Sequence, residues 1–141
     1  TRIASRAMEM GIPVTFHNCG KIQEFLPFME KFNVKYTNPA QETNDLENLV
    51  KEYKGGRMVF CGGWDWDSHI PPHFPDFTPE DEEYIKESVR HSIDKYSGEG
   101  NYCYCGGAMG LRGNPNVQKM NAVIREEAYV YGRKVYGYTG D

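Results

Sequence analysis

The sequence predicts an α/β fold built from successive parallel β/α units. Four short runs rich in β-branched and aromatic residues are each followed by a segment with apolar residues at helical spacing. Two of these segments open with a capping residue and a proline, Thr78-Pro79 and Asn114-Pro115. With 39% hydrophobic residues, 141 residues are enough for a single packed domain. Such alternation favours parallel strands joined by right-handed crossovers.

The first predicted unit follows an opening helical segment that ends near Gly11. A strand is expected over residues 12–17, and an apolar helical face then runs from Ile22 to Phe32. Pro27 is placed in the first turn of a second short helix, because an interior proline costs about 3 kcal/mol. Since the chain opens inside a helical pattern, we expect it to be a piece of a longer protein.

The second and third predicted units are shorter. A strand over residues 34–37 ends at Asn38-Pro39, and a helix follows over residues 45–53. A strand over residues 57–61 then runs into a long loop, residues 62–77, which contains both tryptophans. Loops of this length are often functional.

The fourth unit begins with the clearest helix start in the sequence. Thr78 is the predicted N-cap, Pro79 the first helical residue, and acidic residues fill the first turn. A strand over residues 101–105 and a final helix beginning at Asn114-Pro115 complete the chain. These connections fit either an open doubly wound sheet or half of an eight-unit barrel, which needs about 250 residues.

Composition excludes several classes of function. A net charge of −4 and a pI of about 5.6 provide no basic surface for nucleic acid. The sequence has no apolar run near the roughly 20 residues of a spanning helix and no secretory signal pattern, so we expect a soluble, cytoplasmic protein. In that compartment the four cysteines are expected to be reduced thiols.

Residues able to bind a metal gather at the predicted strand ends, where α/β proteins bind ligands. His17 and Cys19 are two residues apart, so on an extended strand both side chains lie on one face. Together with a thiol from the last strand they would form a three-ligand zinc site with one open position. Spacing alone does not choose between Cys103 and Cys105, but Cys105 is nearer the rim and is favoured.

The same residues also have structural interpretations. Cysteine is among the most frequently buried residue types, so each thiol taken alone is more often a core residue, and Cys61 is assigned to packing. His69 and His73 lie in the long loop among Asp65, Asp67 and Asp76 and are interpreted as solvated loop residues.

These segments together resemble the C-terminal half of the uroporphyrinogen decarboxylase superfamily, which includes the cobamide-dependent methyltransferases. The resemblance covers nearly the whole chain. It rests on IPVTFHNCG at residues 12–20, FCGGWD at residues 60–65, the Thr78-Pro79-Glu80 helix start, YCGG at residues 104–107 and the Asn114-Pro115 helix.

The resemblance implies that residues 1–141 supply the last four units of a (β/α)8 TIM-type barrel. In the methyltransferase branch a His-x-Cys strand end and a distant Cys hold zinc, and those positions match His17, Cys19 and Cys105. True decarboxylases have a glycine-rich segment at the first of these positions and a His at the second. The resemblance therefore favours methyl transfer over porphyrinogen decarboxylation.

The implied activity of the intact parent chain is methyl transfer between a cobamide, carried on a corrinoid partner protein, and a thiol or a methylated small molecule. The candidate rim for substrate or partner is the long loop, with Trp64, Asp65, Trp66 and His69. Two alternatives remain: a metal-free lyase of the decarboxylase type, and a non-catalytic half-barrel that self-associates or pairs with the missing N-terminal half.

Overall fold

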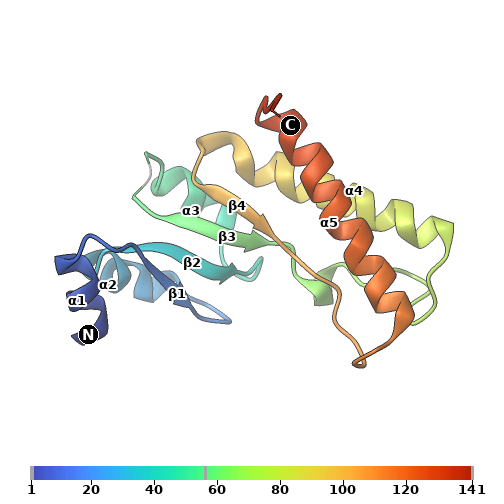
Figure 1. Cartoon of the computed structure of the whole chain (residues 1–141), viewed down its shortest axis with the longest axis horizontal. Coiled ribbons are helices and arrows are strands. Elements are labelled where there is room, and N and C mark those ends of the chain that lie inside the picture. Colours follow the sequence, from blue (N-terminus) through green and yellow to red (C-terminus); the bar gives the residue numbers. More distant parts are fainter. Residues whose placement is uncertain (1, 56, 141) are drawn as a thin grey trace. The chain divides into compact units, whose positions relative to one another are not determined.

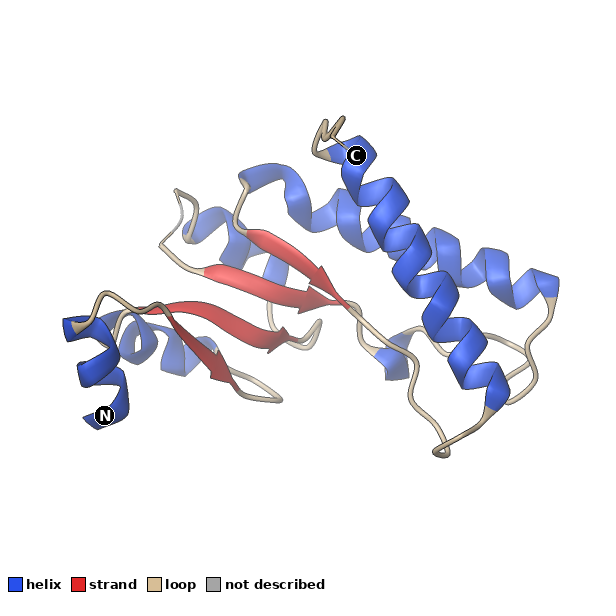
Figure 2. Cartoon of the chain, viewed as in Figure 1, coloured by secondary structure: helices blue, strands red, loops and turns tan. Residues whose placement is uncertain are grey.

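The computed structural model describes residues 2–55 and 57–140, which form an α/β fold with a four-stranded, all-parallel sheet (Figures 1 and 2). The strands are β1 (Val14–His17), β2 (Val34–Ala40), β3 (Val59–Gly63) and β4 (Tyr102–Cys105). The α-helices are α1 (Arg2–Glu9), α2 (Leu26–Lys31), α3 (Leu46–Glu52), α4 (Pro79–Tyr96) and α5 (Pro115–Val135). Short 3-10 turns η1 (Gln23–Phe25), η2 (Trp66–Ser68) and η3 (Ser97–Glu99) lie between them.

The chain divides into two compact units. The first contains the described residues up to Gly63 together with Tyr96–Cys105, and so holds the whole sheet. The second contains Trp64–Lys95 and the described residues from Gly106 onward, and so holds most of α4 and all of α5.

The strand order is β1-β2-β3-β4, with every neighbouring pair parallel. Each strand is joined to the next by a segment that contains a helix, so the predicted parallel β/α units are confirmed. A doubly wound sheet reverses its strand order at a switch point. The described strands have no such reversal.

The predicted helix starts are also confirmed. Asn114 caps α5, its side chain accepting hydrogen bonds from the backbone N–H groups of Asn116 and Val117. Pro27 lies in the first turn of α2, and α4 begins at Pro79 directly after Thr78. Local sequence is sufficient here because capping and proline geometry act within a single turn.

Two strands end later than predicted, and three begin one or two residues later, at Val14, Val59 and Tyr102. Strand β2 continues past Pro39 to Ala40, and β3 continues past Cys61 to Gly63. Proline lacks a backbone N–H and is tolerated in a sheet at irregularities. The β2–β3 register shifts between Thr37 and Ala40, where Pro39 lies, and Ala40 then pairs with Gly62.

One face of the sheet carries the core of the first unit. Buried side chains of α2 and α3 pack against it, with Phe60 of β3 fully buried (Figure 1). At about 25 cal/mol per Å² of apolar surface, this burial is the main stabilising contribution in the unit. The core cluster comprises Ile22, Leu26, Met29, Val34, Ala40, Leu46, Leu49, Val50, Tyr53, Met58, Phe60, Tyr96 and Tyr102.

The opposite face carries thiol and polar side chains, because successive residues of a strand alternate between faces. Thr37 and Phe60 are register partners on the core side, so their successors Asn38 and Cys61 lie on the other side. We call this surface the thiol face, defined by His17, Asn38, Cys61, Cys103 and Cys105.

The second unit is organised by α4 and α5. Arg90 on α4 donates through Nε to Glu127 on α5 at 2.6 Å, and Tyr131 donates to the Asp94 carboxylate at 2.9 Å. The apolar stripes of the two helices are buried at Ile85, Val89, Ile93, Met120 and Ile124. Among the described residues, no helix is long and apolar enough to cross a membrane.

Candidate functional site

The three predicted metal ligands lie at the carboxyl ends of strands in the first unit. His17 is the last residue of β1, Cys19 follows two residues later, and Cys105 is the last residue of β4. All three side chains are exposed. The Cys19 Sγ lies 3.8 Å from the His17 Nε2, so these two predicted ligands are neighbours in space.

A fourth residue, Asn38 of β2, connects His17 to Cys105. Its Oδ1 is 3.2 Å from the His17 Nδ1, and its Nδ2 donates to the Cys105 Sγ at 3.7 Å. An amide oxygen only accepts, so this contact assigns the ring proton to Nδ1 and leaves a lone pair on Nε2, the nitrogen that faces Cys19. The arrangement therefore presents one imidazole nitrogen and one sulfur side by side.

Sequence reasoning missed Asn38. The local sequence places Asn38 at the end of the second predicted strand and indicates no role for it. The signal that identifies it is the sheet register, in which Asn38 is the partner of His17. Register depends on long-range pairing and is not visible in local sequence.

Two glycines of β3 lie between Asn38 and Cys105. Gly63 is the register partner of Cys105, and Gly62 is the partner of Ala40. A Cβ at Gly62 would lie 2.4 Å from the Ala40 carbonyl oxygen. A Cβ at Gly63 would lie 2.8 Å from the Tyr102 hydroxyl oxygen, so neither position has room for a side chain.

The remaining thiols form a pair of their own. Cys61 and Cys103 are register partners on β3 and β4, and their side chains are hydrogen-bonded. The hydrogen bond with Cys61 lowers the pKa of Cys103 to about 6, against the opposing effect of burial. The same bond, together with burial, raises the pKa of Cys61.

This arrangement separates the two candidates for the third ligand. Cys105 contacts Asn38, whereas Cys103 contacts Cys61. Within residues 2–55 and 57–140, however, no three His, Cys, Asp or Glu side chains converge closely enough to surround a metal ion. The predicted donors are thus arranged as one close pair, His17 and Cys19, with Cys105 held nearby through Asn38.

The predicted rim residues lie in the second unit, where the two tryptophans are packing residues. Trp64 stacks on His69, with ring centroids 5.0 Å apart at 14°, and its Nε1 donates to the Ser88 hydroxyl at 2.9 Å. Trp66 meets Phe74 edge to face at 5.2 Å. Both indoles are buried, so of the four predicted residues only Asp65 and His69 are partly exposed.

His73 was expected to be a solvated loop residue, and the structure gives it a specific partner. Its Nδ1 lies 2.9 Å from Oδ1 of the fully buried Asp81, and its backbone N–H donates to the same oxygen at 3.2 Å. The His73 side chain is still 46% exposed in the loop, and it meets Asp81 because the loop folds back onto the first turn of α4.

The Asp81 carboxylate also accepts hydrogen bonds from the backbone N–H and the hydroxyl of Thr78, at 2.9 and 2.8 Å. Burial by itself would raise the pKa of Asp81, but the bonds from Thr78 and His73 outweigh it and lower the pKa to about 2. In return, hydrogen bonding and charge attraction from Asp81 raise the pKa of His73. This cluster serves the start of α4 and offers no free ligand.

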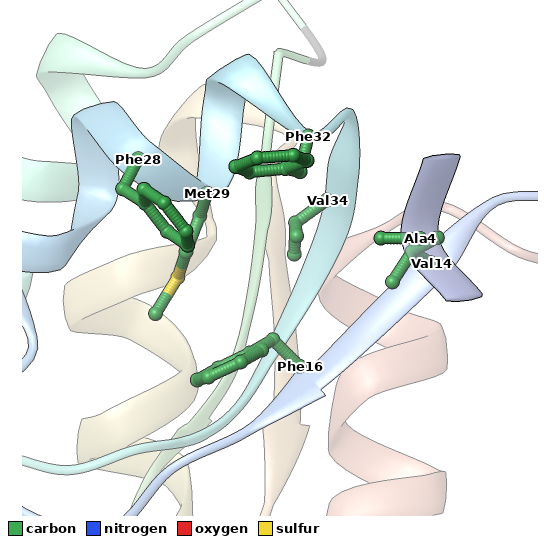
Figure 3. Close-up of a pocket in the computed structure, with 7 residues that line it drawn as sticks. All are labelled: Ala4, Val14, Phe16, Phe28, Met29, Phe32 and Val34. Carbon is green, nitrogen blue, oxygen red and sulfur yellow. The ribbon is translucent and has the colours of Figure 1, made fainter. Parts of the chain in front are cut away.

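A separate apolar pocket lies on the core side of the sheet, beside β1 (Figure 3). It has a volume of about 100 Å³ and is lined by seven apolar side chains of α1, β1, β2 and the α2 region, with Phe16 and Phe28 prominent. Among the described residues its lining is entirely apolar, which suits packing rather than chemistry.

No protein-family model, curated protein or solved structure gives a significant match to this chain. The functional argument therefore depends on the geometry of the site.

Proposed function

We propose that this chain is the C-terminal half of a (β/α)8 barrel of the uroporphyrinogen decarboxylase superfamily and carries the zinc site of a corrinoid-linked methyltransferase. The observation behind the proposal is the contact of Asn38 with both His17 and Cys105, beside Cys19, at the carboxyl ends of parallel strands. Barrel enzymes carry their chemistry at this end of the strands.

The sequential strand order supports the half-barrel. Four parallel strands in chain order, each followed by a helix, are what half of an eight-unit barrel contributes. Strands β1 and β4 are the two edges of the described sheet. Unpaired edges are usually covered or paired, and a second set of four units would pair both.

The donor set fits zinc in chemistry and, for two of its members, in distance. Zinc binds imidazole nitrogen at about 2.0–2.1 Å and thiolate sulfur at about 2.3 Å, which places tetrahedral ligands about 3.6 Å apart. The His17 Nε2 and Cys19 Sγ are 3.8 Å apart. Cys105 would supply the third ligand, leaving the fourth position open for substrate.

Each residue has a defined part in the proposal. Asn38 fixes the His17 tautomer and its amide N–H donates to the Cys105 sulfur, the outer-shell role that orients and tunes metal ligands. A zinc ion held there supplies Lewis-acid chemistry, either lowering the pKa of a substrate thiol or polarising the oxygen or nitrogen of a methyl donor. Asp65 and His69 are the candidate contacts for the corrinoid partner.

The first test is metal content. We expect about one zinc per chain in the reduced, untagged protein, measured by mass spectrometry, and loss of that zinc in Cys105→Ala. Cys103→Ala is the matched control, since it removes a thiol from the same strand and the same face and should retain the metal. Reduced wild-type protein that binds no added zinc, or loss of zinc in Cys103→Ala alone, would contradict the proposal.

The second test is methyl transfer. With zinc bound, the intact parent chain should transfer the methyl group between free methylcobalamin and a small thiol, followed by the visible spectrum of the corrinoid. His17→Ala should abolish that change, whereas His91→Ala, an exposed histidine on α4, should not. Turnover of a porphyrinogen without metal would instead establish the lyase alternative.

A further inference from the structure

Cys61 and Cys103 lie directly opposite each other on neighbouring strands. They are register partners on β3 and β4, and both side chains lie on the thiol face, where they are hydrogen-bonded to each other. Cys103 is exposed and Cys61 is half-buried. Two thiols in contact on an accessible surface are a potential redox pair.

The backbone geometry suits a disulfide between them. Neighbouring strands lie about 4.8 Å apart, which is inside the Cα separation of about 4.4–6.8 Å that disulfides span. Register partners also direct their side chains to the same face, so the two thiols face each other across a single strand spacing.

The other pairs of thiols do not face each other across neighbouring strands. Cys103 and Cys105 are two residues apart on one strand, so their parallel Cβ atoms are separated by about 6.6 Å, against the roughly 3.5–4.5 Å required. The register partner of Cys105 is Gly63, which has no side chain. Cys19 follows β1, which pairs only with β2 among the described strands.

We propose that Cys61 and Cys103 are a thiol-modification site that forms a reversible intrachain disulfide by exchange with a small-molecule disulfide. The exposed Cys103 attacks as the thiolate and forms a mixed disulfide, releasing one small-molecule thiol after proton transfer. Cys61 then attacks the Cys103 sulfur; its proton goes to the departing thiolate, and a second thiol is released. Two protein thiols are oxidised to one disulfide, and one small-molecule disulfide is reduced to two thiols.

The modification is independent of the proposed zinc site. It uses neither Cys19 nor Cys105 and leaves the contacts of Asn38 with His17 and Cys105 in place. The disulfide proposal and the methyltransferase proposal can therefore be tested independently, and failure of one does not contradict the other.

The test is disulfide mapping. Reduced, chelator-treated protein is incubated with oxidised glutathione, alkylated and digested with chymotrypsin, which cleaves after Tyr102 and Tyr104 and so separates Cys103 from Cys105. We expect the free-thiol count to fall from four to two, with a linked peptide pair that contains Cys61 and Cys103, and full recovery on reduction.

Two variants of the same strand sharpen the test. Cys105→Ser should still form the disulfide, its thiol count falling from three to one, whereas Cys103→Ser should form none. A linkage through Cys105 or Cys19, or four alkylated thiols after oxidation, would overturn the proposal. If Cys103→Ser fails to fold by circular dichroism, the wild-type peptide map still decides between these outcomes.

Discussion

Two histidines of this chain have very different surroundings. His73 contacts the buried carboxylate of Asp81, which also accepts hydrogen bonds from Thr78 at the start of α4. His17 lies on the exposed thiol face and contacts the Asn38 amide on one side and the Cys19 sulfur on the other.

The difference shows how burial of the partner separates a structural histidine from one available for chemistry. The His73 ring contacts the buried Asp81 carboxylate at the start of α4. This contact stabilises the helix start, because an unpaired buried charge is costly. The partly exposed Asn38 amide contacts Nδ1 of the His17 ring and leaves Nε2 facing Cys19. We therefore expect changes around His73 to affect stability and changes around His17 to affect metal binding.

The largest expected effect is at Asp81. Asp81→Ala removes the acceptor for Thr78 and His73, and a pKa lowered from 3.8 to about 2 corresponds to about 2 kcal/mol of stability at neutral pH. Urea unfolding at pH 7 measures this loss. Glu80→Ala, in the same first turn but exposed, is the control and should cost less than about 1 kcal/mol.

The Asp81 carboxylate also predicts a loss of folding stability at acid pH. Because its folded-state pKa is depressed, the Asp81 contribution is fully present above about pH 4 and is lost as the pH falls towards 2. Unfolding midpoints across this range should fall less steeply in Asp81→Asn than in the wild type. Equal slopes would show that the carboxylate is not the group that titrates.

The next effect concerns Asn38. Asn38→Ala should weaken zinc binding by about tenfold, or about 1.4 kcal/mol. Without the amide, the His17 ring is no longer held in one tautomer, and Cys105 loses its N–H donor. Competition with a chromogenic chelator measures the affinity. Asn48→Ala, on the exposed side of α3, should leave it unchanged. Equal zinc affinity in the wild type, Asn38→Ala and Asn48→Ala would show that Asn38 does not contribute to the site.

A smaller effect is expected at His73. Its folded-state pKa is raised by Asp81, so its contribution is present below the unfolded pKa of about 6.5 and is lost as the pH rises through the higher folded value. Urea midpoints above pH 6 should therefore decline more in the wild type than in His73→Gln. The opposite trend would contradict the ion pair.

The smallest effect on stability is expected at His17. His17→Ala lies on an exposed strand end, so its free energy of unfolding should stay within about 0.5 kcal/mol of the wild type. The same variant should lose the zinc. A large loss of stability without any metal effect would make His17 a structural residue like His73 and remove the contrast between them.

The sequence by itself determined the order of strands and helices, the caps at Thr78 and Asn114, and the placement of Pro27, because each depends on interactions within one or two turns. It also indicated His17, Cys19 and Cys105 as strand-end donors. It did not predict that β2 would pass through Pro39, since that requires a register irregularity created jointly with β3.

Only the tertiary structure decided which of these residues meet. The contact of Asn38 with His17 depends on the parallel register of β1 and β2, and its contact with Cys105 depends on β4 lying in the same sheet. The Cys61–Cys103 pairing depends on register between β3 and β4, and the role of His73 depends on a loop folding back onto Asp81. Such pairings join residues 8 to 67 positions apart, beyond the reach of local periodicity.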